Sequence, residues 1–204
     1  MITDRRRLRS DQELLVQRVG EAAAAGVDLV QVRERDLEAR ELSRLVTRCL
    51  EAVRGTRTRV LVNDRLDVAL ATGAHGVHLR SDSMAAARAR SLTPVGFLIG
   101  RSVHSVDEAV RVGADGGIDY LLFGAVFATS SKPGHTPAGV HMLTEVAAAT
   151  TVPVLGVGGI TAETMTQLAG SGSAGFAAIG WFVDGGEGVA RQGLADAARA
   201  FEKG

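Results

Sequence analysis

The sequence lacks the residues that would point to a secreted or a nucleic-acid-binding protein. It contains one cysteine, so no internal disulfide can form, which favours a reducing compartment. The formal net charge at pH 7 is +0, and a neutral chain has no positive field with which to attract nucleic acid or an acidic membrane surface. We therefore expect a cytoplasmic protein that binds no nucleic acid.

Long hydrophobic runs are also absent. No apolar run reaches the roughly 18 residues that a membrane-spanning helix needs, and the basic run Arg5–Arg7 is not followed by the hydrophobic region of a signal peptide. We expect Arg5–Arg7 to form a solvated face, and we expect no membrane partner. The lone Cys49 falls in an apolar stripe at helical spacing, which predicts a core position and not a nucleophile.

Glycine and aliphatic residues are abundant and follow a regular alternation. The chain has 25 Gly and 46% hydrophobic residues, and short apolar runs alternate with helical patterns from end to end. Its 204 residues suit one domain. Eight strand-helix units predict a single (β/α)₈ TIM barrel over residues 1–204, with an open doubly wound sheet as the alternative. The expected strands are residues 1–3, 27–33, 60–63, 76–79, 96–100, 120–124, 152–157 and 175–179.

Two glycine-rich segments follow the last two expected strands. Gly158 and Gly159 come after the seventh strand, and Ile179 and Gly180 end the eighth. Backbone amides in such loops can approach a phosphate closely, and these loops form the usual phosphate site of this barrel. The alternative is that the glycines serve only tight turns, but two such loops favour phosphate binding.

Polar residues follow the second and third expected strands. Arg33 can point into the mouth of the barrel and hold an anionic ligand, or it can pair with Glu34 and Asp36 at the rim, and the sequence favours neither. Asn63 and Asp64 follow the third strand. The Asp64 carboxylate could bind Mg²⁺, but an Asp at this position is more often the N-cap of the next helix.

One histidine and one lysine complete the candidate site. His104 follows the fifth strand, and an imidazole at a barrel mouth can take up and return a proton near neutral pH. The alternative is that His104 only decorates a turn whose Ser105 caps the next helix. The loop 129–139, which includes Thr129 and Lys132, is the longest in the chain and predicts a lid that brings a cation to the ligand.

Together these motifs resemble the thiamin phosphate synthase superfamily, over nearly the whole chain. The resemblance implies a (β/α)₈ fold and a thiazole phosphate ligand. The segments that carry it are residues 2–5, 31–35, 62–65, 76–79, 127–132 and 158–160.

Two branches of this superfamily differ in their use of metal. The synthases join a hydroxymethylpyrimidine diphosphate to a thiazole phosphate, and resemblance to them implies Mg²⁺ held by Asp64 and by a second carboxylate where this chain has Ser83. The segment 100–105 instead resembles the TenI-like thiazole tautomerases, in which the histidine matching His104 is the proposed acid/base. We therefore expect an isomerase that aromatises a carboxythiazole phosphate by a proton shift, with no metal or other cofactor.

In this expected isomerase each candidate residue has a role. His104 moves the proton, and the other residues bind the substrate and its phosphate: Arg33, Asn63, Thr129, Lys132, Gly158, Gly159, Ile179 and Gly180. Two alternatives stay open, a synthase with a rearranged Mg²⁺ site and a non-catalytic regulatory protein that binds thiazole or thiamin phosphate. Whether the chain forms a homo-oligomer is also left open.

Overall fold

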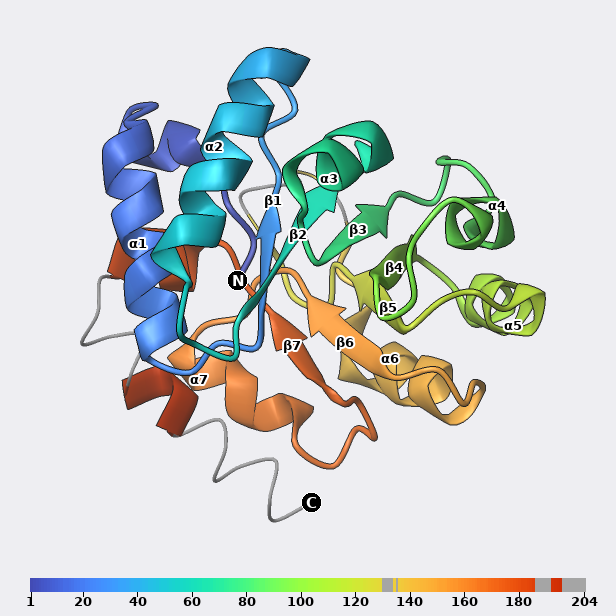
Figure 1. The fold of residues 1–204 in the computed structure, drawn as a ribbon. Helices are drawn as coiled ribbons and strands as arrows, with labels where there is room; N and C mark the ends of the chain where they lie inside the picture. The colour runs from blue at the N-terminus through green and yellow to red at the C-terminus, as the bar shows by residue number, and fades with distance from the viewer. Residues whose placement is uncertain (130–133, 135, 186–191, 196–204) are drawn as a thin grey trace. The chain divides into compact units, whose positions relative to one another are not determined.

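The computed structural model describes residues 1–129, 134, 136–185 and 192–195. Strands alternate with helices along the chain (Figure 1). The chain divides into two compact units, which are described one at a time. The first comprises residues 1–78, 93–98 and 179–195, and the second contains residues 79–92 and 99–178.

In the first unit three neighbouring parallel strands are covered by helices. Val30 of β1 is paired in register with Val60 of β2, and Val62 of β2 with Val77 of β3. Val30, Val32, Val60, Val62 and Val77 make one side of these strands apolar and buried, and the other side also carries the polar Gln31, Asn63 and His78. The elements are η1 (Arg5–Leu8), α1 (Gln12–Ala24), β1 (Leu29–Val32), α2 (Ala39–Ala52), β2 (Arg59–Asn63), α3 (Leu66–Thr72) and the start of β3 (Gly76–Leu79).

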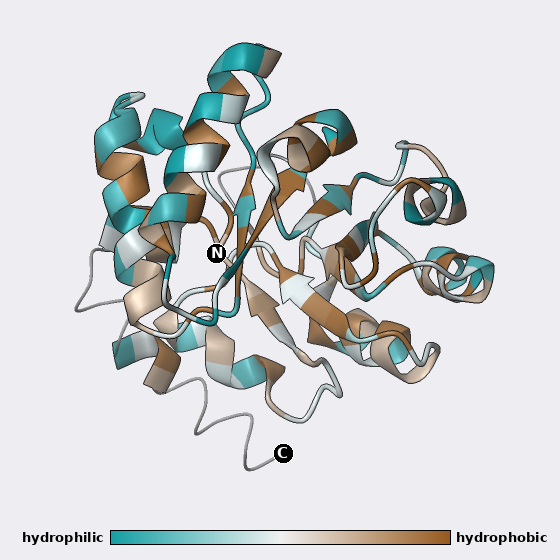
Figure 2. Cartoon of the chain, viewed as in Figure 1, coloured by the Kyte–Doolittle hydropathy of each residue, from teal (hydrophilic) through white to brown (hydrophobic). Residues whose placement is uncertain are grey.

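The helices of this unit begin and pack as their sequences dictate. The Asp11 side chain caps α1 by accepting a hydrogen bond from the Leu14 N–H at 3.0 Å. Helix α2 lies beside α1 in Figure 1 and carries one hydrophobic and one hydrophilic face (Figure 2). Cys49 lies on the buried face, and burial raises the pKa of its thiol to about 12. The prediction of a core cysteine is therefore confirmed.

The second unit repeats the pattern with four parallel strands in chain order. Gly100 permits the close approach of β4 and β5, because a Cβ atom there would lie 2.1 Å from the Tyr120 ring. The elements are α4 (Ala86–Ser91), β4 (Leu98–Val103), α5 (Val106–Asp115), β5 (Tyr120–Gly124), α6 (Gly139–Ala148), β6 (Val154–Val157), α7 (Ala162–Met165), η2 (Thr166–Leu168) and β7 (Gly175–Ala177).

The described residues form seven strands and not the eight of a closed barrel. The first expected strand is reduced to one parallel bridge between Ile2 and Gln31. It stops there because Thr3 and the backbone N–H of Arg5 both bond to the Glu34 carboxylate, and the chain then turns into η1. The fold is therefore an α/β fold with seven parallel strands, and the prediction of a closed (β/α)₈ barrel is wrong in this respect.

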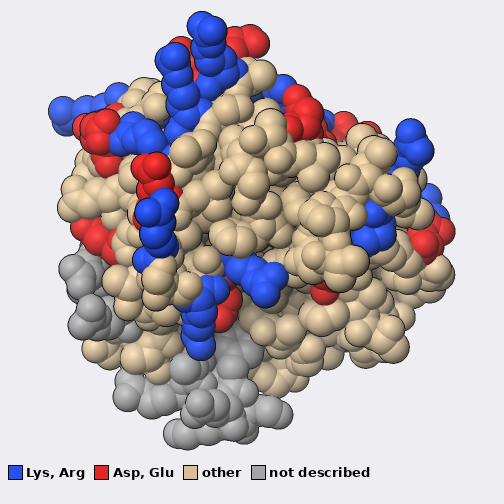
Figure 3. Space-filling model, viewed as in Figure 1, with Lys and Arg blue, Asp and Glu red and all other residues tan. Residues whose placement is uncertain are grey.

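The surface carries charges of both signs. Figure 3 shows basic and acidic side chains interspersed over α1 and α2, where Arg48 pairs with Glu13. Arg6 and Arg7 are exposed, as expected of a solvated face, while Arg5 is half-buried. Each of the three guanidinium groups pairs with a carboxylate. Within the ranges that the structure describes, no helix is long and apolar enough to cross a membrane.

Candidate functional site

The carboxyl ends of β1 and β2 lie at one edge of the sheet in the first unit, because the two strands are parallel. Arg33 follows β1, and Asn63 ends β2. The Gln31 side-chain nitrogen donates a hydrogen bond to the Asn63 side-chain oxygen at 3.0 Å. Asn63 is thus held in place by a side chain of the neighbouring strand, next to the position where Arg33 leaves the sheet.

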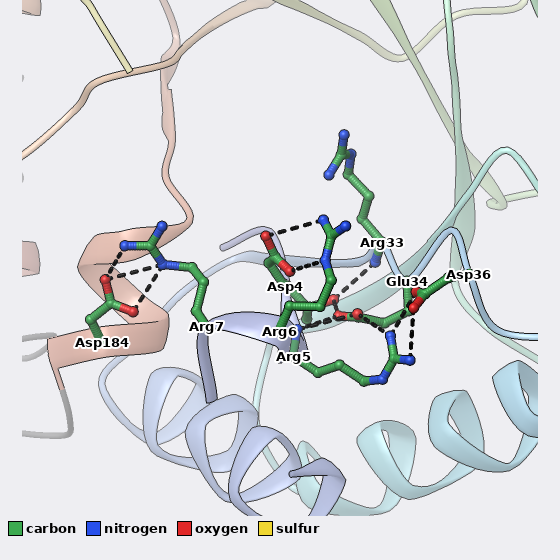
Figure 4. Close-up of polar contacts among 9 residues, drawn as sticks. Asp4, Arg5, Arg6, Arg7, Arg33, Glu34, Asp36 and Asp184 are labelled. Carbon is green, nitrogen blue, oxygen red and sulfur yellow. Dashed lines mark hydrogen bonds and ion pairs between the residues drawn. The ribbon is translucent and has the colours of Figure 1, made fainter. Parts of the chain in front are cut away.

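A buried carboxylate organises the backbone on both sides of this edge. Glu34 is 4% exposed, and its Oε1 accepts a hydrogen bond from the Thr3 hydroxyl at 2.6 Å. The carboxylate also accepts from the Arg5 backbone N–H at 3.1 Å and from the Arg5 guanidinium at 3.2 Å. The Thr3 oxygen in turn accepts from the Arg33 backbone N–H at 2.9 Å. Glu34 therefore fixes the backbone of Arg33 through Thr3 (Figure 4).

The sequence allowed Arg33 to bind either a ligand or the carboxylates of Glu34 and Asp36. In the structure Arg5 binds both of these carboxylates. Its guanidinium donates to Asp36 at 2.7 and 2.9 Å, and these bonds hold the pKa of Asp36 down to about 2. Figure 4 shows the Arg33 guanidinium pointing away from Glu34 and Asp36. Among the residues that the structure describes, no group bonds to the Arg33 guanidinium. The rim ion pairs thus belong to Arg5.

A half-buried guanidinium without a partner is suited to bind an anion. Burial lowers the pKa of Arg33 below its ordinary value, and the charge of Arg35 lowers it further, because both disfavour the charged form. The group still carries its charge at neutral pH. A ligand with two anionic oxygens would be held by two parallel N–H bonds and would offset the cost of burying the charge.

Asp64 does not have the capping role that the sequence favoured. The N-cap of α3 is Arg65, whose side chain makes no cap hydrogen bond. Asp64 adopts a φ of 63°, and its backbone N–H donates to the His78 carbonyl at 2.9 Å. This bond keeps Asp64 at the edge of the sheet, one residue before the N-cap, so the N-cap prediction is wrong.

The glycine after β7 packs against an ion pair. Residues 180–185 are helical, and the Ile179 carbonyl accepts hydrogen bonds within that helix. A Cβ atom on Gly180 would lie 3.1 Å from the Arg7 guanidinium and 3.2 Å from the Asp184 carboxylate. Arg7 and Asp184 form an ion pair (Figure 4). A side chain at position 180 would therefore crowd a cation that lies against this turn.

In the second unit, His104 lies between the end of β4 and the start of α5. Ser105 caps α5 by accepting from the Glu108 N–H at 3.1 Å, and the Glu108 carboxylate accepts from the His104 backbone N–H at 2.8 Å. The exposed imidazole has its Nδ1 2.9 Å from the Gly124 carbonyl. A carbonyl only accepts, so Nδ1 carries the proton and Nε2 of the neutral ring is the base. The helix cap and the oriented imidazole therefore coexist.

Gly158 and Gly159 are required by close packing. Their φ angles are 100° and 66°, a region that favours glycine. A Cβ atom would lie 2.7 Å from the Ala125 side chain at the first position and 2.3 Å from the Ala128 carbonyl at the second. The Phe127 N–H donates to the Gly158 carbonyl at 3.0 Å. This packing accounts for both glycines, and their binding of phosphate stays a prediction.

Of the expected lid over 129–139, the structure describes residues 129, 134 and 136–139. Thr129 is half-buried and is the last described residue before a gap. Lys132 lies outside the described residues. The predicted roles of Thr129 and Lys132 remain predictions.

The Mg²⁺ site implied by the resemblance to synthases does not fit the second unit. Ser83 has no carboxylate, and its hydroxyl accepts from the Arg80 backbone N–H at 2.8 Å. The Arg101 guanidinium donates to two carbonyls of the same turn, each at 2.8 Å. A positive group against these oxygens disfavours a second cation. In the part of the chain that is described, no group of three or more His, Cys, Asp or Glu could hold a metal ion.

Sequence reasoning missed Thr3 and Arg101. Thr3 is linked to Glu34 across 31 positions of the sequence, and no local pattern signals such a contact. Arg101 had a signal, because a charged residue inside an apolar strand must find partners for its donors. That signal does not identify the partners, which are the carbonyls of Met84 and Ser81, 17 and 20 positions away in the sequence.

Comparison with known proteins shows one consistent likeness. The family model described as thiamine monophosphate synthase matches residues 1–181. The thiamine-phosphate synthase of Methanoculleus marisnigri is 41% identical over 167 residues, which are 81% of this chain and 79% of that protein. That of Roseiflexus castenholzii is 37% identical over 180 residues, 88% of this chain and 78% of that protein.

Solved structures show the same likeness. Thiamine phosphate pyrophosphorylase from Pyrococcus furiosus superposes with a TM-score of 0.83 at 30% identity, covering 99% of this chain and 94% of that one. A 3-hexulose-6-phosphate synthase superposes with a TM-score of 0.67 at 16% identity, covering 98% of this chain and 95% of that one. The second likeness shows the fold alone.

These relatives overturn the isomerase expected from the sequence. Proteins about 40% identical to this chain are named synthases, and a synthase is a transferase. The segment 100–105, which favoured the tautomerase, builds the start of α5 and the bond from His104 to the Gly124 carbonyl. Such a helix cap and strand end are structural needs that do not specify the reaction, so the isomerase prediction is wrong.

Proposed function

Because the chain belongs to the thiamine monophosphate synthase family, we propose that it is a thiamine-phosphate synthase. The reaction joins a hydroxymethylpyrimidine diphosphate to a thiazole phosphate. A bond forms between the thiazole nitrogen and the pyrimidine methylene carbon, the bond from that carbon to oxygen breaks, and diphosphate leaves with the electron pair. The observation that carries the proposal is the family match over residues 1–181.

Arg33 supports this proposal through its surroundings. Its half-buried guanidinium has no partner among the described residues, while its backbone is held by Thr3. Both substrates carry phosphate groups, and the leaving group gains negative charge as the bond to carbon breaks. A preformed cation at the strand end would stabilise that charge without rearrangement. We assign Arg33 to the binding of a phosphate or diphosphate group.

The other candidate residues are assigned by the chemistry of their groups. In the first unit, Arg7 lies against Gly180 and can add a cation to phosphate binding at that turn, and the Asn63 amide can orient a heterocycle. In the second unit, the His104 Nε2 can hydrogen-bond to the departing diphosphate once it is protonated. Lys132 would add a further cation. Position 83, where the resemblance to synthases implies a second Mg²⁺ carboxylate, holds a serine, so the roles proposed here are those of the chain's own side chains.

Product formation from the two proposed substrates tests this function directly. The purified chain is incubated with hydroxymethylpyrimidine diphosphate and thiazole phosphate, and thiamine phosphate is followed by chromatography after oxidation to its fluorescent form. We expect product from the chain and much less from Arg33→Gln. No product from a folded chain, with or without Mg²⁺, would contradict the proposal.

A further inference from the structure

The turn over residues 80–84 of the second unit is closed by its own serine. The Ser83 N–H donates to the Arg80 carbonyl at 3.2 Å, and the Arg80 N–H donates to the Ser83 hydroxyl at 2.8 Å. Both bonds stay within four residues, and helix α4 begins shortly afterwards. The hydroxyl at position 83 therefore serves the backbone of the turn.

A guanidinium group reaches this turn from β4. Arg101 Nη1 donates to the Met84 carbonyl at 2.8 Å, and Nη2 donates to the carbonyls of Ser81 at 2.8 Å and Ser83 at 3.4 Å. Its Nε is buried and has no partner among the described residues. Three carbonyl oxygens of one turn thus converge on one cationic side chain. Converging oxygens are also the ligands that a hard divalent cation takes.

The Arg101 guanidinium opposes the binding of a second cation at the turn. Arg80 and Arg101 contribute two positive charges, and Asp82 contributes one negative charge that is already paired with Arg80. A divalent ion bound to the same carbonyls would lie close to the Arg101 guanidinium, and the repulsion would oppose its binding. The position that resembles a carboxylate ligand in the synthases holds Ser83, which offers no compensating charge.

We propose that Arg101 is the resident cation of this turn and that it excludes a divalent metal from it. The inference rests on the proposed function, because it concerns how a synthase of this sequence handles diphosphate without the second metal carboxylate. Arg101 acts by holding the turn, so it is a positioning residue. Its charge excludes the metal, and its fork of donors fixes the three carbonyls.

Metal binding without substrate tests the exclusion. Mn²⁺ is titrated into the chain and into R101K, R101Q, S83D and the double variant S83D/R101Q, and free Mn²⁺ is measured by electron paramagnetic resonance. We expect weak binding to the chain and to R101K, which keeps the charge. We expect the double variant to bind at least about tenfold more tightly, because a new carboxylate then meets carbonyls without a competing cation. S83D alone should stay weak, because Arg101 pairs with the new carboxylate.

The opposite result in this titration overturns the proposal. Binding of Mn²⁺ to the unaltered chain as tight as binding to the double variant would show that Arg101 excludes nothing. Hydrogen exchange of the amides in residues 81–84 checks the fold of each variant. A merely structural role predicts that R101K and R101Q behave alike, whereas exclusion by charge separates them.

The rate of the coupling reaction provides a second test. Its outcome distinguishes failure of the metal exclusion from failure of the proposed synthase function. We expect the coupling rate of the chain in EDTA to lie within about threefold of its rate in Mg²⁺, and we expect R101Q, but not R101K, to respond to Mg²⁺. A chain that couples only with Mg²⁺ overturns the exclusion and leaves the synthase assignment standing. A chain that couples under neither condition removes the synthase assignment, and the Mn²⁺ titration then decides the exclusion.

Discussion

Arg33 directly follows β1 and Arg101 lies within β4, and the surroundings of their guanidinium groups are opposite. The backbone of Arg33 is fixed by Thr3 and its guanidinium has no partner among the described residues. The guanidinium of Arg101 is occupied by three backbone carbonyls. The same side chain is therefore left available for a ligand in one unit and is bonded to the fold in the other. Whether it can bind a ligand depends on whether its donors are already bonded.

The largest expected effect is on stability, and it tests whether Glu34 holds the backbone of Arg33 in place through Thr3. Glu34→Gln removes a buried charge and leaves the Arg5 guanidinium without one of its two carboxylates. We expect the free energy of unfolding to fall by about 3 kcal/mol, measured by urea denaturation, and KM for the phosphate substrates to rise. Asp36→Asn is the matched control, since it removes the exposed carboxylate of the same arginine and should cost less. Equal losses in both variants would contradict the organising role of Glu34.

The second-largest effect distinguishes the role of Arg33 in substrate binding from the role of Arg101 in stability. Arg33→Gln removes a charged ligand donor, so we expect a loss of about 2 kcal/mol in substrate binding, or roughly 30-fold in KM. We expect no loss of stability, because no bond to the protein is broken. Arg101→Gln should show the reverse in thermal melting, with a lower Tm. If Arg33→Gln destabilised the chain as much as Arg101→Gln, the comparison would fail.

A smaller effect concerns the strand end that carries His104. Ser105→Ala removes the cap of α5, which should cost about 1 kcal/mol, measured by denaturation. Ser105→Asp keeps an acceptor for the Glu108 N–H and should restore most of the stability. A loss that Ser105→Asp leaves unrepaired would show that the hydroxyl has a role other than capping.

The smallest effect is a pH dependence of stability. Hydrogen bonds from Arg5 hold the pKa of Asp36 at about 2 in the folded chain, below its usual 3.8. Because the folded pKa is the lower one, this stabilisation is complete above the unfolded pKa and is lost as the pH falls towards 2. Unfolding measured from pH 6 to pH 2 should show a shallower decline in Asp36→Asn. Parallel curves would contradict this assignment.

Local patterns predicted the elements better than the contacts between them. The expected strands at 60–63, 76–79 and 120–124 coincide with β2, β3 and β5 to within a residue. The first expected strand failed because the bonds of Thr3 and Arg5 to Glu34 turn the chain away. Periodicity reports the face a residue occupies, but it does not report the partner that ends a strand.

The same limit applied to the candidate site. The sequence left Arg33 undecided between a ligand and two neighbouring carboxylates. In the structure Arg5 holds both of those carboxylates from 29 and 31 positions away, and the binding of a ligand by Arg33 stays a prediction. The chemistry was also misjudged, since the segment 100–105 suggested an isomerase while relatives about 40% identical to the chain are synthases. A short motif that builds a cap and a strand end carries little information about the reaction.

The sequence by itself determined the alternation of strands and helices, the core position of Cys49 and the placing of polar residues at strand ends. These follow from local periodicity, since hydrophobic spacing selects the element and its buried face. Only the tertiary structure decided that Arg5 and not Arg33 neutralises Glu34, and that Arg101 holds the turn where the resemblance implied a metal carboxylate. The partner of a charged group is the nearest opposite group in space, and the fold brings distant segments together to supply it.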